Sequence, residues 1–302
     1  MDICKARGMG PVFRALRIGS SELKIRAWER KNLLGLSIFI GLFLGGFLIH
    51  GHVGVYFNLA AFFIVVGGTF GAGIVCFQIQ RLQIVYRVLK TTYGSPVKNP
   101  EEIVEILVDL SVKSRLQGLL ALEQDEGTTS VAFLRRALGF LVDGYGADDI
   151  RDSLYTEMYH FKVRRDESAR VLHTLAEIAP AFGIVGSVVG LISLFSGMGE
   201  TEVVLAAIPI ALVSTLYGVI MANFFFLPFA ANLQEKTSQE LLLQKIITDG
   251  VLAIQAEVNP RVLETKLKSF LTPAARSPKL VSLERIRERF NIGARHTGTP
   301  GV

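Results

Sequence analysis

Two apolar stretches in the second half of the chain contain hydroxyl side chains that could bind a cation. Ser187 lies in the stretch 178–199, and Ser214 and Thr215 lie in the stretch 203–234. A hydroxyl oxygen can act as a ligand for a cation or hold a bridging water molecule. A serine in a helix can also bond back to the carbonyl four residues earlier and then contribute nothing to an ion. The three hydroxyls are therefore candidates for an ion pathway.

Small residues accompany these hydroxyls at helical spacing. Gly186 and Gly190 are four residues apart, which permits two helices to approach closely along their backbones. The residues that share the two helical faces are Gly183, Gly186, Ser187 and Gly190 in the first stretch and Ser214, Thr215, Gly218 and Ala222 in the second. Ordinary helix packing explains the glycines alone, whereas the hydroxyls leave oxygen atoms for a ligand.

Two prolines interrupt the same stretches. Pro180 lies early in the first stretch, and Pro228 lies near the end of the second. Because proline has no backbone N–H, it removes one i→i−4 hydrogen bond from a helix and favours a kink. Prolines are common in membrane-spanning helices, and Pro209 is a further example here. Pro180 and Pro228 are included in the candidate ion pathway as places where the helices can flex.

Four stretches are apolar and long enough, or nearly so, to cross a membrane as helices. They are Asn32–His50, His52–Ile79, Ile178–Gly199 and Val203–Gln234, and none contains Asp, Glu, Lys or Arg. We therefore expect an all-α, polytopic membrane protein with four transmembrane helices and a helical cytoplasmic domain. An ion carrier normally needs an ionisable group within the membrane, so a partner must supply that carboxylate.

Lysine and arginine lie on only one side of these stretches. The short connections 51–56 and 197–202 contain neither residue type. Because basic residues concentrate on the cytoplasmic side of membrane proteins, both termini and the long loop are expected in the cytoplasm. The chain then divides into a basic N-terminal segment 1–31, a transmembrane hairpin 32–79, a cytoplasmic helical loop domain 80–170, transmembrane helices within 171–234, and a cytoplasmic C-terminal helix with a flexible tail 235–302.

The long loop has the pattern of helices. Pro100 followed by two glutamates indicates a helix start, and apolar residues at helical spacing follow it. A second helix is expected around Val131–Val142 and a third from about Asp148, with no stop signal before the third apolar stretch. A short helix is expected near Ser282–Phe290 in the tail.

Composition argues against several other classes of protein. The formal charge of +5 fits the basic bias of a membrane protein better than nucleic-acid binding. No P-loop, dinucleotide-binding, nucleophile-elbow or zinc-protease motif occurs, so no enzyme, cofactor or resident metal is expected. Cys4 and Cys76 do not make a disulfide framework, and both thiols are expected to be reduced.

Four segments of the sequence resemble the MotA-type subunits of flagellar stators. These segments are GGTFGA at 67–72, SRLQGLLALE at 114–123, APAFGIVGSVVGLISL at 179–194 and STLYGVIMANFFFLPFA at 214–230. They occur in the family's order and fit the expected topology from about Asn32 to Leu271. The basic segment 1–31 is longer than the family needs.

The resemblance implies a function and a set of partners. Such subunits form a homopentamer around two copies of a single-span MotB-type partner, which carries the ion-binding aspartate and anchors to peptidoglycan. Ion flow turns the ring against the rotor protein FliG, which drives flagellar rotation in chemotaxis from the bacterial inner membrane. The family's two prolines match Pro180 and Pro228, its hydroxyl matches Thr215, and its rotor-facing charges match Arg115 and Glu123.

The same charges can be considered from the sequence alone. If their segment were one helix, Arg115 and Glu123 would lie about 12 Å apart along it and could not pair. Both would then be available to another protein, although a solvated helix face would look the same.

The resemblance also bears on which ion is transported. Hydroxyls at the positions of Ser187 and Ser214 resemble sodium-driven members of the family, although both are Ser here rather than the usual Thr. We therefore expect sodium rather than a proton, bound transiently at Ser187, Ser214 and Thr215.

Three other functions compete with a flagellar stator. TolQ/ExbB-type motors that energise the cell envelope share the membrane core but generally have three spans. ZorA-like defence channels carry a long helical tail, whereas about seventy residues follow the fourth stretch here. A passive packing subunit would have no need of the hydroxyls beside two prolines. Four spans with one long loop favour the stator.

Overall fold

The computed structural model describes residues 38, 41, 45, 46, 53–94, 99–196 and 201–273, and all regular structure in them is helical. Three helices within these residues are long and apolar enough to cross a membrane: Leu59–Cys76, Ala147–Ser196 and Ala207–Gln255. The all-α prediction is confirmed. The predicted first span at 32–50 falls almost wholly outside the described residues. The basic segment 1–31 and the predicted helix near 282–290 lie outside them as well.

The described chain packs as two compact units. The membrane unit consists of residues up to 94 together with 162–237, and it holds the most apolar helices. The loop unit consists of 99–161 together with 238–273. Helix α9 (Ala147–Ser196) contributes residues to both units as one continuous helix of 50 residues. The prediction of a helix that runs from about Asp148 into the third apolar stretch is therefore confirmed.

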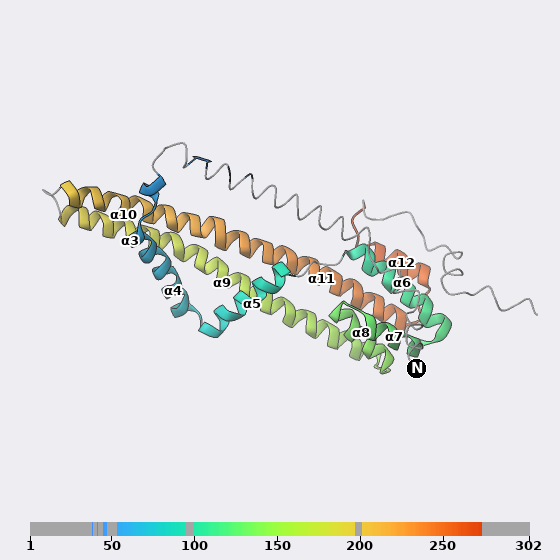
Figure 1. Ribbon diagram of the computed structural model, residues 1–302. Coiled ribbons are helices and arrows are strands. Elements are labelled where there is room, and N and C mark those ends of the chain that lie inside the picture. The colour runs from blue at the N-terminus through green and yellow to red at the C-terminus, as the bar shows by residue number, and fades with distance from the viewer. Residues whose placement is uncertain are drawn as a thin grey trace, which may run out of the picture. The chain divides into compact units, whose positions relative to one another are not determined.

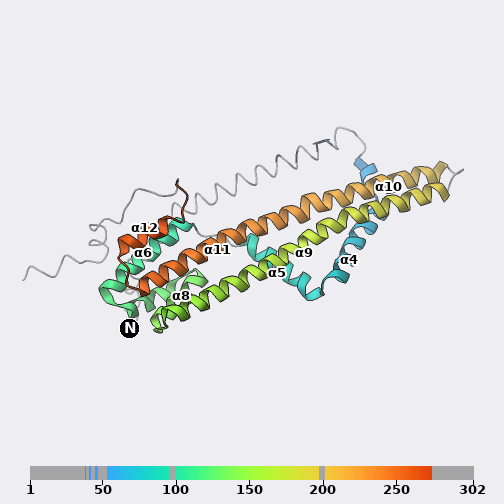
Figure 2. The same ribbon diagram turned by 180° about the vertical axis from the view of Figure 1, so that it is seen from behind.

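The membrane unit is built around α9 and the helix that follows it in the chain, and these two lie side by side (Figures 1 and 2). The second apolar stretch packs against them. The elements of this stretch are α3 (Leu59–Phe62), the π-helix η2 (Phe63–Gly67) and α4 (Gly68–Cys76), preceded by the short helix η1 (Val53–Tyr56). The fourth stretch comprises α10 (Thr201–Ile220), the π-helix η4 (Met221–Phe226) and the start of α11 (Leu227–Gln255).

Helix α5 (Ile79–Gly94) is held in the membrane unit by its last turn. Lys236 Nζ of α11 donates to the carbonyl oxygen of Thr92 at 2.5 Å, and Arg165 of α9 donates to the Thr92 hydroxyl. Cations near the C-terminus of a helix interact favourably with its dipole. Two basic side chains therefore stabilise the end of α5 and join it to its neighbours.

The loop unit contains short helices around the ends of two long ones. Its elements are α6 (Pro100–Gln117), η3 (Leu119–Leu122), α7 (Glu123–Thr128), α8 (Ala132–Val142), α12 (Pro260–Lys268) and parts of α9 and α11. Asn99 Oδ1 accepts a hydrogen bond from Glu101 N and caps α6, which begins at Pro100 as the sequence predicts. The predicted helix around 131–142 is also confirmed. Gly144, with φ of 76°, follows α8 and permits the turn towards α9.

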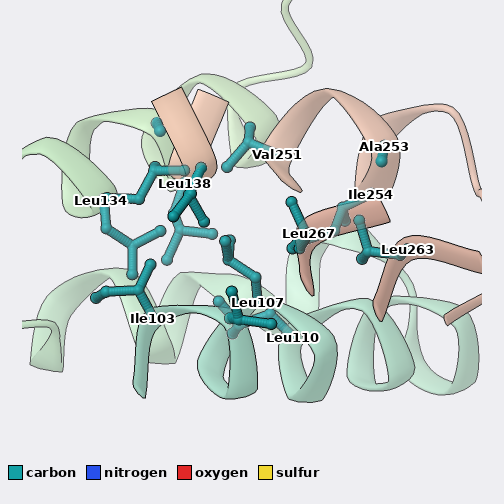
Figure 3. Close-up of a cluster of buried hydrophobic side chains, with 14 of the residues drawn as sticks. Ile103, Leu107, Leu110, Leu134, Leu138, Val251, Ala253, Ile254, Leu263 and Leu267 are labelled. Carbon is teal, nitrogen blue, oxygen red and sulfur yellow. The ribbon is translucent and has the colours of Figure 1, made fainter. Parts of the chain in front are cut away.

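Large aliphatic side chains fill the core of the loop unit. Figure 3 shows Leu107 of α6, Leu134 and Leu138 of α8, and Val251 of α11 directed into one cluster. All four side chains are fully buried. Because α11 is far along the chain from α6 and α8, this cluster is what makes the loop and the region after the fourth apolar stretch one unit.

Lys245 of α11 ties two helices together at the edge of this core. Its ammonium donates hydrogen bonds to Tyr155 Oη of α9 and, at 3.3 Å, to Asp249 Oδ1. Burial by itself would lower the pKa of Lys245, but the hydrogen bonds to Tyr155 and Asp249 outweigh it and raise the pKa above its ordinary value. Lys245 is therefore a cation at neutral pH.

Candidate ion pathway between two apolar helices

Helices α9 and α10 touch through their backbones along a seam of small residues. A Cβ atom at Gly218 would lie 2.6 Å from the carbonyl oxygen of Ala179, and one at Gly190 would lie 2.5 Å from the backbone nitrogen of Ala211. A Cβ at Gly183 would lie 3.0 Å from the carbonyl oxygen of Ser214. No side chain fits at Gly190 or Gly218 unless the helices separate, and one at Gly183 would press on the neighbouring backbone. The close approach expected from the glycine spacing is therefore present.

Two of the predicted hydroxyls meet on this seam. Ser187 Oγ lies 2.5 Å from Thr215 Oγ1, and it donates to the carbonyl oxygen of Ala211 at 2.5 Å. Ser187 Oγ also lies 3.1 Å from the carbonyl oxygen of Gly183. Thr215 is exposed and Ser187 is half-buried, so the pair lies at the surface of the membrane unit. The arrangement gathers hydroxyl and carbonyl oxygens at one accessible point, which is what a partly dehydrated cation requires.

Ser214 lies apart from that pair. It is fully buried, and its hydroxyl donates to the carbonyl oxygen of Ile210, four residues earlier, at 2.6 Å. A Cβ at Gly186 would lie 2.5 Å from both Cβ and Oγ of Ser214. Ser214 therefore fills the space left by Gly186 and bonds back to its own helix, which is the alternative that the sequence left open for these serines.

The two predicted prolines have different surroundings. Pro180 lies within α9 on the seam, because a Cβ at Gly218 would approach its Cα to 3.1 Å. Pro228 is the second residue of α11, is exposed, and comes directly after the π-helix η4. π-helical turns often mark functional sites and bends in longer helices. Pro180 thus adjoins the close packing, whereas Pro228 adjoins an irregular turn of the fourth stretch.

Tyr217 is a positioning residue that the sequence did not single out. Its hydroxyl donates to the carbonyl oxygen of Tyr56 at 2.6 Å and accepts from the backbone N–H of Asn58 at 3.2 Å. Asn58 Oδ1 in turn caps α3 by accepting from Ala61 N at 2.9 Å. Tyr217 therefore fixes the start of the second apolar stretch against α10. A tyrosine hydroxyl inside an apolar stretch needs a partner, and that signal was available in the sequence.

The charged pair Arg115 and Glu123 lies in the loop unit. The segment is not the single helix on which the 12 Å estimate depended. Helix α6 ends at Gln117, Gly118 follows with φ of 85°, and α7 begins at Glu123. Both side chains are exposed, and Arg115 donates a hydrogen bond to the carbonyl oxygen of Glu257. The structure therefore places the two charges on either side of Gly118 and the 3-10 helix η3 (Leu119–Leu122).

Comparison with known proteins gives one consistent answer. Residues 126–245 match the model of the MotA/TolQ/ExbB proton channel family. The chain is 34% identical to motility protein A of Borreliella burgdorferi over 74% of its length and 86% of that protein. It is 31% identical to the chemotaxis protein PomA of Vibrio alginolyticus, over 81% of its length and 98% of that protein.

A solved structure has the same fold. In the flagellar MotAB stator complex of Bacillus subtilis, one chain is 30% identical to this one and superposes with a TM-score of 0.74. The match covers 81% of this chain and 96% of that chain.

Proposed function

Because this chain belongs to the MotA/TolQ/ExbB proton channel family, and within it to the motility protein A group, we propose that it is a stator subunit of a flagellar motor. In this role it is a membrane protein that conducts ions and not an enzyme. The observation that carries the proposal beyond family membership is the contact between Ser187 and Thr215. It puts accessible oxygen atoms at the surface of a membrane unit whose apolar stretches have no charged side chain.

A second kind of subunit must supply the carboxylate for ion transfer. The related solved structure is a complex of MotA with MotB, so a MotB-type protein with one membrane span is the proposed partner. Its span would lie against the exposed face that carries Thr215, since an intramembrane ionisable group needs polar partners. Several copies of this chain, in a homopentamer, would surround the partner.

The proposed topology follows the basic residues. Residues 32–50 would form the first of four transmembrane helices in the bacterial inner membrane. Segments 1–31, 80–170 and 235–302 would then face the cytoplasm. With the loop domain in the cytoplasm, Arg115 and Glu123 would face the rotor protein FliG. The exposure of both side chains, at the end of α6 and the start of α7, supports this assignment.

Sodium is the proposed ion. Sodium needs several oxygen ligands, and the seam offers the hydroxyls of Ser187 and Thr215 next to the carbonyl oxygen of Ala211. A proton needs only the partner's carboxylate and a path of water molecules, and the family description names protons. The number of oxygens around Ser187 favours sodium, with Ser214 acting through packing.

Swimming speed as a function of external sodium tests this proposal. At fixed pH, with potassium replacing sodium, speed should fall as sodium is removed. Ser187→Ala and Thr215→Val should raise the sodium concentration needed for half-maximal speed. Ser196→Ala is the matched control, because the one bond that the described residues offer the Ser196 hydroxyl is to the carbonyl oxygen of Ile192 in its own helix, at 2.8 Å. Speed that is independent of sodium but lost with a protonophore would assign the motor to protons.

A further inference from the structure

A buried ion pair joins the two segments that carry the proposed rotor-facing charges. Lys113 Nζ of α6 lies 2.6 Å from Asp125 Oδ2 of α7, and the two side chains are only 13% and 8% exposed. Lys113 comes two residues before Arg115, and Asp125 comes two residues after Glu123. Each buried charge therefore lies about half a helical turn from an exposed one.

The turn between these segments has little local stability of its own. Helix η3 has four residues and α7 has six, and helices of this length do not persist alone in water. Gly118, with φ of 85° and ψ of 167°, ends α6 in a conformation that is essentially restricted to glycine. Leu122 is fully buried in the core of the loop unit. Tertiary contacts must therefore set the position of α7.

Asp125 also connects α7 to α8. Its backbone carbonyl oxygen accepts a hydrogen bond from Thr129 Oγ1 at 2.6 Å. The carbonyl oxygen of Thr129 accepts from Arg135 Nε at 3.2 Å and from Arg135 Nη2 at 2.6 Å. Through Lys113 on one side and Arg135 on the other, α7 is fixed to both neighbouring helices.

Burial makes this arrangement sensitive to the loss of either charge. If Lys113 or Asp125 alone is neutralised, the remaining charge loses its 2.6 Å ion-pair partner at a site with little access to water, and the segment is expected to shift. The exposed charges Arg115 and Glu123 have no such requirement. The inner pair holds the segment, and the outer pair is exposed, although Arg115 also donates to the carbonyl oxygen of Glu257.

We propose that Lys113 and Asp125 are positioning residues for the rotor contact. Their ion pair sets where α7 presents Glu123 relative to Arg115. This inference rests on the proposed function, because it takes Arg115 and Glu123 as the charges that act on the rotor. Loss of the ion pair should reduce torque while leaving assembly and ion flow unchanged.

The first experiment compares Asp125→Asn and Lys113→Met with wild type in the full stator complex. Complex recovered with the partner and ion influx into cells should be unchanged, whereas swimming speed should fall at least twofold. Asp148→Asn is the matched control, because it breaks the ion pair between Asp148 and Arg151 in the same unit. That pair is 2.6 Å long, and its side chains are 88% and 49% exposed. The control should swim at wild-type speed.

A distance measurement separates positioning from general damage. Spin labels at Leu116→Cys and Gly127→Cys, with Cys4 and Cys76 changed to serine, report the separation of α6 from α7. Leu116 is exposed, and a Cβ at Gly127 would meet no atom within 4 Å. The distance distribution should be narrow in wild type and broadened by Asp125→Asn. A distribution that stays narrow would overturn the inference.

A second variant covers the case in which the single changes prevent accumulation. Lys113→Met combined with Asp125→Leu replaces the buried ion pair by apolar side chains, which proteins often tolerate. This double variant should assemble and conduct ions, yet swim more slowly than wild type because the packing does not fix one register of α7. Wild-type speed in the double variant would overturn the inference.

Charge reversals distinguish this inference from the proposed function. Arg115→Glu and Glu123→Lys should impair swimming, with partial rescue by complementary changes in the rotor protein. If both reversals swim normally, the rotor contact is wrong and the positioning role fails with it. If the reversals impair swimming while the Lys113 and Asp125 variants do not, the rotor contact stands and only the positioning role fails.

Discussion

Glycine has a different structural role in each of the two units of this protein. In the membrane unit, Gly183, Gly190 and Gly218 lie where a Cβ atom would enter the backbone of the neighbouring helix. In the loop unit, Gly118 and Gly144 have φ of 85° and 76°, and a Cβ at either would meet no atom within 4 Å. The glycines of the membrane unit allow two helix backbones to approach closely. The glycines of the loop unit adopt positive φ angles that other residues rarely adopt.

The buried side chains differ in the same way. Three of the five buried core residues that lie within the apolar stretches of the membrane unit are alanine (Ala179, Ala222 and Ala230), whereas leucine and isoleucine dominate the core of the loop unit. Lipid is as apolar as leucine, so burying a large side chain gains little in a membrane, and close backbone packing gains more. In water the burial of large apolar surface is the main stabilising term. The two units are therefore sensitive to opposite changes in side-chain size.

Adding volume on the seam should have the largest effect. Gly218→Val would place side-chain atoms against the carbonyl oxygen of Ala179 and the Cα of Pro180. Because these are backbone atoms, α9 and α10 would have to separate, at a cost at or above the roughly 1–3 kcal/mol typical of overpacked cores. We expect almost no complex in membranes, measured by immunoblot. Gly71→Val is the control, because a Cβ at Gly71 meets no atom within 4 Å. Equal loss in both variants would contradict this account.

Removing the proline on the seam should stop rotation without preventing assembly. Pro180→Leu restores a backbone N–H that can bond to the carbonyl oxygen of Ala176 and stiffens α9 where it adjoins Gly218. We expect normal recovery of the complex with its partner and no swimming. Full motility would reduce Pro180 to a packing residue.

Removing volume should matter most in the loop unit. Leu134→Ala empties a fully buried site and should cost roughly 2–5 kcal/mol. Hydrogen exchange of the α8 amides in the intact complex should then accelerate about 30-fold or more. Val262→Ala, at a side chain that is 58% exposed, should leave exchange unchanged. Similar acceleration in both variants would argue against a leucine-packed core.

The smallest change in stability is expected at Glu257, whose backbone conformation in the loop unit favours glycine. Glu257, with φ of 50°, is the one non-glycine residue with positive φ in the described part of the chain. Glu257→Gly should relieve this conformation and stabilise the unit by about 0.5–1 kcal/mol, seen as slower exchange at the end of α11. Glu257→Ala removes the same charge but keeps the conformation, so it should give no stabilisation.

Much of this architecture could be predicted from the sequence because it depends on local patterns. The absence of charge in 178–199 and 203–234 marked the apolar helices, and Pro100 with its glutamates marked the start of α6. The spacing of Gly186 and Gly190 indicated a close helix contact, which the structure contains.

Other features depend on contacts between distant residues. Nothing in the neighbourhood of Ser187 indicated that its hydroxyl would meet Thr215 while Ser214 bonded back to Ile210, since that depends on the rotation of one helix against another. The sequence alone did not decide whether one helix continues through Gly118, and the structure shows that α6 ends before it. The conformation of Gly118 depends on contacts made by residues after it, namely the burial of Leu122 and the ion pair of Asp125 with Lys113.

The π-helix η4 sets how the residues after it are rotated about the helix axis relative to the residues before it. A π-turn takes up more residues than an α-turn, and each residue of an α-helix rotates the chain by about 100°. Deleting one residue from 221–226 would therefore keep a continuous helix but swing Ala230 and Leu233 away from their buried positions relative to Gly218. The number of residues in this segment therefore sets the rotation of the following helix as well as its length. In a homologue with one residue more or fewer here, different positions of the following helix would be buried.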